Sequence, residues 1–231
     1  MRKTLLLMLI TLPVFARSAG APVNLNNIPG RTAAPGDGVC RDCHTGSPLN
    51  EPGGSLRIEA GTYKPGIPQT VKVTISHPNA ERWGFQITAR WAKDPTQNAG
   101  RFNAPNSDVQ VLTGGYVTHT LPGTLSNGAN GAKTFEVEWV APEGTDDSDV
   151  IFYAAGNAAN NNAGSGSGNQ GDRIYTTQTR IQTDITCAFT ERPTLPASGR
   201  YASTPWHRPT TRGSSPTSST PQSATRRRCG C

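Results

Sequence analysis

Hydrophobic and polar residues alternate with a period of two along much of the chain between residues 54 and 185. In one such run, Val71, Val73 and Ile75 are separated by Lys72 and Thr74. Similar runs lie at 56–58, 83–91, 109–111, 116–119, 135–139, 150–154 and 174–185. This alternation is typical of β-strands that bury one face in a core and leave the other face wet.

Turn-forming residues separate these runs, as in Lys64-Pro65-Gly66 and Pro142-Glu143-Gly144. No stretch between them has the 3.6-residue period of an amphipathic helix. About eight strands in about 130 residues predict an all-β fold, namely one antiparallel immunoglobulin-like β-sandwich. The polar segment 156–171, rich in Gly, Asn and Ser, is predicted to be a long surface loop.

The first 21 residues are predicted to be a secretory signal peptide. Arg2 and Lys3 precede an apolar run at 5–12, and cleavage sites follow at Ala16 and at 19–21. The run is shorter than the roughly 20 residues of a membrane span, and no second apolar stretch follows. The mature chain is therefore expected to have no membrane span and to be periplasmic, extracellular or at the cell surface.

Charge and composition divide the remainder. The 22 Lys and Arg against 16 Asp and Glu give a formal charge of +6. That excess lies at the two ends, so residues 18–187 are mildly acidic and nucleic-acid binding is not expected. Three segments are predicted: 22–53 as an N-terminal segment, 54–186 as the β-sandwich, and 187–231 as a disordered Ser/Thr/Pro/Arg-rich tail.

The run Cys40-Arg41-Asp42-Cys43-His44 has the C-x-x-C-H spacing by which c-type haem is attached. Cys40 and Cys43 would form thioethers to the two vinyl groups of one porphyrin, and His44 would be the proximal ligand of the haem iron. Two alternatives remain open, a disulfide between the cysteines and half of a zinc site. A second pair of zinc ligands at metal-binding spacing is not found in the sequence.

A methionine cannot be the second axial ligand, because Met1 and Met8 both fall within the signal peptide. His119, which lies in a predicted strand, is the favoured candidate for a distal ligand. The other candidates are His77, His207, a Lys or a Tyr, or an open position. Two histidine ligands would favour electron transfer, whereas an open position would favour binding of a gas or peroxide. The residues proposed for an apolar haem wall are Pro35, Leu49, Trp83 and Trp91.

Other chemistry finds little support. No nucleophile elbow, H-E-x-x-H zinc motif, EF-hand loop or phosphate-binding glycine loop is present. Thiol redox catalysis is also disfavoured, because its C-x-x-C opens a helix within a βαβ unit and no such unit is indicated. The protein is therefore not expected to be an enzyme.

Several short strings, in order, resemble the bacterial reeler-type (reelin-domain-like) family, whose members differ in their C-terminal anchor. They are GRTAAPGDG at 30–38, RWGFQ at 82–86, YVTHT at 116–120, FYAAGNAAN at 152–160 and GDRIYTT at 171–177. The resemblance covers about residues 28–186 and implies an immunoglobulin-like sandwich that is exported. It also implies that C-x-x-C-H is common at this position among bacterial members. It says little about activity, since fold does not determine function.

Two hypotheses about function follow. In the first, an exported reeler-like protein binds one haem c for electron transfer or sensing, with an unknown redox partner. In the second, it is a non-enzymatic binding or adhesion module for a cell-surface ligand, and Cys40 and Cys43 form a disulfide.

Overall fold

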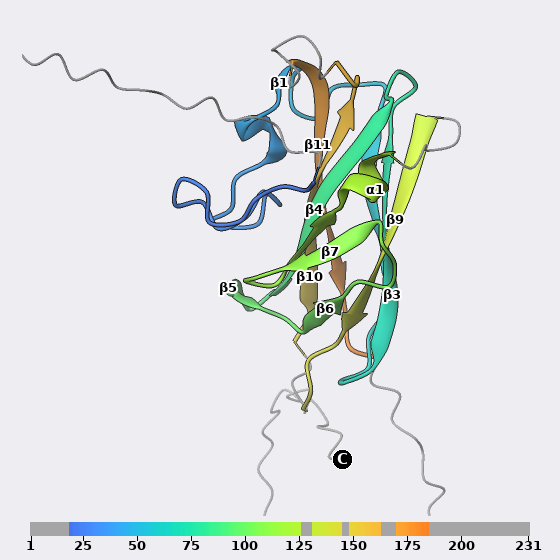
Figure 1. Cartoon of the computed structure of the whole chain (residues 1–231). Helices are drawn as coiled ribbons and strands as arrows, with labels where there is room; N and C mark the ends of the chain where they lie inside the picture. The colour runs from blue at the N-terminus through green and yellow to red at the C-terminus, as the bar shows by residue number, and fades with distance from the viewer. Residues whose placement is uncertain (1–18, 126–130, 145–147, 163–169, 185–231) are drawn as a thin grey trace, which may run out of the picture. The chain divides into compact units, whose positions relative to one another are not determined.

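The computed structural model describes residues 19–125, 131–144, 148–162 and 170–184 (Figure 1). Most of the predicted signal peptide and the predicted tail lie outside the described residues. All eight predicted strands are present: β2 (Ser55–Glu59), β3 (Pro68–Ser76), β4 (Arg82–Trp91), β7 (Val109–Leu112), β8 (Tyr116–His119), β9 (Ala132–Val140), β10 (Val150–Ala159) and β11 (Gln170–Ile181). Five further elements are present: η1 (Cys40–Asp42), β1 (Thr45–Gly46), β5 (Asp94–Asn98), β6 (Arg101–Asn103) and α1 (Leu121–Leu125).

The strands form two sheets that pack face to face. The larger sheet has seven strands in the order β1-β11-β10-β4-β8-β7, with β5 also paired to β4. The smaller sheet has the order β2-β3-β9-β6. All pairings are antiparallel except that of β1 with β11. The predicted all-β antiparallel sandwich is confirmed.

The core lies between the sheets and is rich in aromatic rings. Phe85 of the large sheet stacks on Phe135 of the small sheet with ring centroids 4.5 Å apart. Trp139 meets Phe152 and Tyr63 edge to face, at centroid distances of 5.1 and 5.6 Å. Such ring pairs add roughly 0.5–1.5 kcal/mol each beyond the area they bury. The inward-facing residues of the predicted strands therefore hold the two sheets together.

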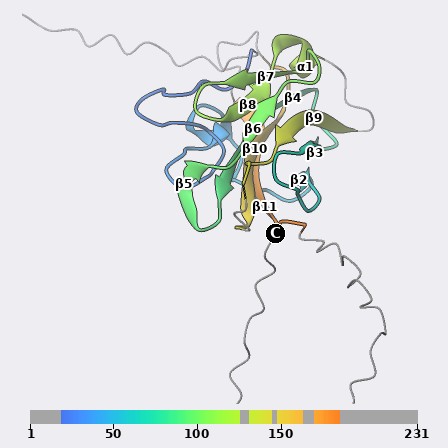
Figure 2. The same cartoon turned by 90° about the horizontal axis from the view of Figure 1, so that it is seen from below.

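The outer face of the large sheet is not wet, contrary to the expectation from alternation. Residues 19–44 cross this face, on the side away from β3 and β9, as two perpendicular views show (Figures 1 and 2). Beneath them Gln86 and Thr88 of β4 are fully buried, and Arg90 is nearly so. The polar side chains on this face are therefore buried between the sheet and the N-terminal segment. Buried polar groups need hydrogen-bond partners, so this layer must be hydrogen-bonded internally.

The polar loop predicted at 156–171 is shorter than expected. Strand β10 continues to Ala159 and β11 begins at Gln170, so only the middle of that segment lies between strands. Small residues such as Gly156 fit within β10 because the neighbouring sheet approaches closely: a Cβ there would lie 3.0 Å from Leu56. The outward residue Asn157 is consequently buried within a strand rather than exposed in a loop.

Candidate functional site

The C-x-x-C-H motif forms one tight turn built around η1. The Cys40 carbonyl accepts hydrogen bonds from the backbone N–H of Cys43 at 3.2 Å and of His44 at 3.0 Å. Both cysteines are partly buried. The next residue, Thr45, begins β1 and pairs with β11 of the large sheet. The turn thus brings two sulfurs and one imidazole together and fixes them to the sheet at their C-terminal end.

Arg31 fixes the other side of the motif. Its guanidinium lies beneath the motif, with Nε 3.0 Å from Asp42 Oδ2 and the Arg31 side chain only 4 % exposed. The same group donates to the carbonyls of Gly30 at 3.0 Å and Leu25 at 3.3 Å. The Arg31 backbone N–H donates to Gln86 Oε1 on β4. Through its guanidinium and its backbone N–H, Arg31 therefore ties the N-terminal segment, the motif and the large sheet together.

His44 is held by a carboxylate from a strand far along the chain. Its Nδ1 lies 2.6 Å from Oδ2 of Asp172, whose side chain is 1 % exposed. A carboxylate oxygen accepts, so Nδ1 carries the proton and donates it. The Asn157 amide also donates to the same oxygen at 3.2 Å, and the Asn160 backbone N–H donates to Oδ1 at 3.1 Å. Three donors thus fix the carboxylate that orients the imidazole.

Asn157 lies directly against the imidazole. Its amide nitrogen is 3.0 Å from His44 Nδ1 and 3.5 Å from Nε2. Its carbonyl oxygen Oδ1 is buried and has no hydrogen-bond partner among the described residues. A buried acceptor without a donor is uncommon, and one beside a candidate ligand indicates a site where a further group or a water is bound.

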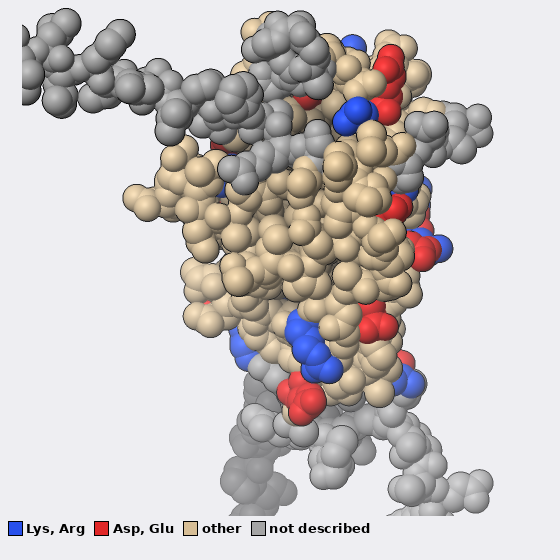
Figure 3. Space-filling view, in the orientation of Figure 1, with Lys and Arg blue, Asp and Glu red and all other residues tan. Residues whose placement is uncertain are grey.

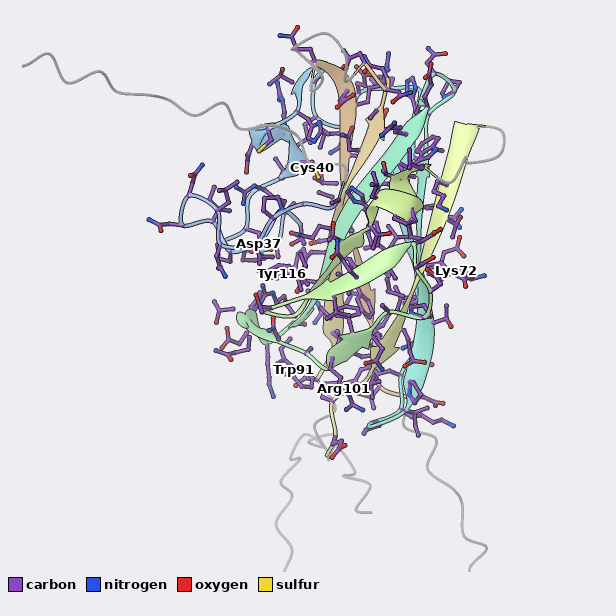
Figure 4. All side chains as sticks on the ribbon, viewed as in Figure 1. Asp37, Cys40, Lys72, Trp91, Arg101 and Tyr116 are labelled. Atoms are coloured by element: carbon purple, nitrogen blue, oxygen red, sulfur yellow. The ribbon has the colours of Figure 1, made fainter. Side chains whose placement is uncertain are left out.

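A second buried network anchors the segment that leads into the motif. Tyr116 donates its hydroxyl hydrogen to Asp37 Oδ1 at 2.7 Å, and Arg90 donates to the Tyr116 oxygen at 2.7 Å. The Arg90 guanidinium also lies 5.4 Å from the centre of the Tyr116 ring. Gly30 is required beside this ring, because a Cβ there would lie 2.3 Å from it. Figure 4 shows Asp37 and Tyr116 close together below Cys40.

The Tyr116 network predicts a loss of stability at alkaline pH. Burial, together with the hydrogen bond to Asp37, raises the pKa of Tyr116 from 10 to about 12. The unfolded chain loses this proton first, so the contribution is complete below pH 10 and is lost as pH rises from 10 to 12. We expect the loss to reach about 2 kcal/mol. Tyr116→Phe should have a lower free energy of unfolding in urea at pH 8. Between pH 10 and 12 its free energy of unfolding should fall less steeply with pH than that of the wild type. Equal slopes for the variant and the wild type would contradict this account.

The two thiols are not poised as nucleophiles. Burial, with smaller contributions from Cys43 and Asp42, raises the pKa of the Cys40 thiol from 9.0 to about 12. Burial also raises the pKa of Cys43, although Arg31 opposes it. Catalytic thiols have lowered pKa values, so these two are protonated at neutral pH and differ from those of thiol oxidoreductases.

The structure gives His119 a hydrogen-bonding role. It lies on the outer face over Gly84, where a Cβ would come within 2.7 Å of its Cε1. Gly84 of β4 pairs with Asn157 of β10, whereas His119 of β8 pairs with Val109 of β7. His119 Nδ1 accepts the Phe85 backbone N–H at 3.0 Å. The neutral ring then carries its proton on Nε2, the nitrogen with which an iron ligand would bind. Iron ligation by His119 would therefore cost this hydrogen bond.

The other predicted residues are spread over the molecule. His77 follows β3 in the smaller sheet, and its Nδ1 accepts the Asn79 N–H at 3.1 Å. Burial lowers the pKa of His77. Trp83 belongs to the core and cannot form a haem wall. Trp91 is seven residues along β4 from Gly84, or about 23 Å at the rise of a strand. Leu49 is 37 % exposed, five residues after the motif, and is the remaining large apolar candidate there.

Sequence reasoning missed the residues that hold the motif, namely Arg31, Gln86, Asn157, Asn160 and Asp172. All five lie in the strings that carry the family resemblance. Their partners are distant in sequence: 128 residues separate His44 from Asp172. One pattern in the sequence could have indicated them. The alternation typical of a strand continues through the polar residues at 156–159 and 172–176, which lie in β10 and β11.

Three further observations concern the site and its surroundings. Within the residues that the structure describes, no three His, Cys, Asp or Glu side chains gather as a bound metal ion would require, so the zinc alternative finds no ligand set there. The face shown in Figure 3 has scattered charges of both signs at its margins and no basic patch. None of the helices in the described ranges has the length and hydrophobicity of a membrane span.

These observations define a two-sheet antiparallel β-sandwich whose large sheet is covered by a motif-bearing N-terminal segment. The chain belongs to the Reeler domain family, an extracellular-type domain, whose family model matches residues 41–159. The match begins inside the motif, after Cys40, and ends before Asp172.

Comparison with solved structures finds similar sandwiches. The human F-spondin reeler domain is 22 % identical over 60 % of this chain and 94 % of its own length, with a TM-score of 0.37. The Reelin-N domain of F-spondin is 22 % identical over 60 % of this chain and 91 % of its own, with a TM-score of 0.37. The seventh ScaB type I cohesin from Pseudobacteroides cellulosolvens is 8 % identical over 64 % of this chain and 98 % of its own, with a TM-score of 0.33. No curated protein matches the chain.

Proposed function

We propose that this Reeler-domain protein carries one c-type haem on Cys40, Cys43 and His44, and that it acts outside the cytoplasm in electron transfer or sensing. The hydrogen bond from His44 Nδ1 to the buried Asp172 carboxylate, at 2.6 Å, is the observation that carries the proposal. An imidazole whose Nδ1–H is fixed by a carboxylate presents Nε2 as its metal-binding nitrogen, as histidine ligands of metals commonly do.

The residues present fit a covalently held haem in their chemistry. Attachment needs both motif cysteines as thiols, and both lie partly buried in one turn with His44. Each thioether forms when the S–H adds across a vinyl C=C bond: the sulfur bonds to the carbon next to the ring, the hydrogen goes to the terminal carbon, and nothing is oxidised overall. The orphaned Oδ1 of Asn157 and the exposed Leu49 near the motif also suit a bound group.

Bound haem would supply a one-electron iron couple, or a site for a small ligand if one axial position is open. The protein's own contribution is placement. The Arg31–Asp42 ion pair holds the turn, the pairing of Thr45 with Gln170 fixes its end, and Asp172 orients the imidazole. Because each contact is made to the large sheet or to the segment that covers it, the motif is held rigidly.

Export is the second part of the proposal. The chain already contacts the sandwich at residues 20–21: the Ala21 N–H donates to Thr118 Oγ1 at 3.1 Å, and Gln86 Nε2 donates to the Ala21 carbonyl at 3.1 Å. Gly20 is buried against Thr118. Cleavage after Ala16 would preserve these contacts, whereas cleavage after Ala21 would remove all of them. The contacts therefore favour the earlier of the two sites.

One experiment tests both parts. The full chain is expressed in a host with haem-attachment machinery, and the exported protein is analysed by absorption spectroscopy and intact mass. We expect a Soret band that survives acid-acetone extraction, and a mass equal to the chain from Arg17 plus one haem. His119→Gln should have the same haem absorption spectrum as the wild type, because His119 is not expected to be an axial ligand. An exported, folded and colourless protein of unmodified mass would overturn the haem proposal.

A further inference from the structure

We propose that Asp172 is a positioning residue that fixes the Nδ1–H tautomer of His44 and lowers the reduction potential of the haem bound there. This inference rests on the proposed function. Asp172 would touch neither the haem nor a ligand and would act only through the imidazole. Asp172 lies in the GDRIYTT string at 171–177, which takes no part in haem attachment itself.

Asp172 is buried in a position that is energetically unfavourable for a carboxylate without hydrogen-bonding or basic partners. Its side chain is 1 % exposed. Among the described residues, His44 is the one basic side chain within ion-pair distance of it. The nearby cation Arg173, next in the chain, pairs instead with Glu51 at 2.6 Å. The negative charge on this face is therefore directed at the imidazole.

The carboxylate is also held still. Asn157 from β10 donates to Oδ2 at 3.2 Å, and the Asn160 backbone N–H donates to Oδ1 at 3.1 Å. Both oxygens thus have fixed donors, and Oδ2 faces His44 Nδ1 at 2.6 Å. This is the arrangement of a metal-ligating histidine with its supporting carboxylate.

The consequence is electrostatic. A carboxylate that accepts the Nδ1–H makes the imidazole a more basic ligand. A more basic ligand with a nearby negative charge stabilises ferric over ferrous iron, so the reduction potential falls. Asp172→Asn keeps the shape of the side chain and removes the charge. The potential should therefore rise in this variant.

The experiment uses the haem-loaded full chain and potentiometric titration of its absorption bands. At a fixed applied potential, Asp172→Asn should shift the ferrous-to-ferric ratio at least tenfold toward ferrous, which is about 59 mV for a one-electron couple. Asp149→Asn is the matched control, because it removes a carboxylate that pairs with Arg180 at 2.6 Å instead of with the motif. The control should stay within about twofold of the wild type. A loaded Asp172→Asn protein with an unchanged ratio would overturn the inference.

A second measurement does not depend on haem. The double variant Cys40→Ser, Cys43→Ser cannot form thioethers, and its His44 ring can be observed by nitrogen-15 NMR. We expect the Nδ1–H tautomer in this background and its loss when Asp172→Asn is added. An identical tautomer in both proteins would contradict the positioning role. A wild-type protein without haem would instead overturn the proposed function, so the two failures are distinguishable.

Discussion

Replacing both motif cysteines by alanine should abolish covalent haem attachment completely. Cys40→Ala, Cys43→Ala removes both sulfurs that can add to a porphyrin, and thioethers are the bonds that survive denaturation. The fold should persist, because neither cysteine belongs to the core of the sandwich. Haem staining of a denaturing gel should read zero, and circular dichroism should show the all-β spectrum of the wild type.

The matched control is Cys187→Ala, a cysteine outside the motif. It should stain as strongly as the wild type. A single variant, Cys40→Ala or Cys43→Ala, should retain at most one thioether. If the double variant still stains, attachment is not through this motif. If the wild type is unstained and alkylation shows its motif thiols to be blocked until reduction, the cysteines form a disulfide and the protein is a binding module.

The strands could be predicted because their cause is local. Burial of Val71, Val73 and Ile75 in β3 follows directly from a period of two, since successive side chains point to opposite faces. The same reasoning located each of the eight predicted strands. It could not locate β1, which has two residues and exists because Thr45 meets Gln170 across the fold.

The covered outer face could not be predicted, because a polar residue in a strand looks the same in the sequence whether it meets water or protein. Gln86 has the spacing of a wet position, yet it is 0 % exposed. Its burial depends on Arg31, 55 residues earlier, whose N–H it accepts. Only the fold brings these two residues together.

The motif shows the same division. The spacing of Cys40, Cys43 and His44 is local and could be identified from the sequence alone. The groups that decide what the motif can do, Asp172 and Asn157, come from strands that pair only after folding. A motif therefore predicts the ligands, whereas their supporting residues follow from the topology.

Substitution of Arg31 by methionine should have the largest effect on stability of any change considered for the N-terminal segment. Removing one partner of a buried ion pair typically costs about 3–5 kcal/mol. Asp42 is 34 % exposed and is therefore partly resolvated, so we expect about 3 kcal/mol. The carbonyls of Leu25 and Gly30 also lose donors. Urea unfolding monitored by circular dichroism measures the change.

Arg41→Met serves as the control, because Arg41 lies in the same turn but is exposed. It should change stability by less than about 0.5 kcal/mol. A double-mutant cycle with Asp42→Asn separates the ion pair from the other contacts of Arg31. Once Arg31 is methionine, Asp42→Asn should cost much less than it does in the wild type. Additive costs would mean that Arg31 acts through the carbonyls alone, and that the motif turn is held to the sheet from its β1 end and by Asp172.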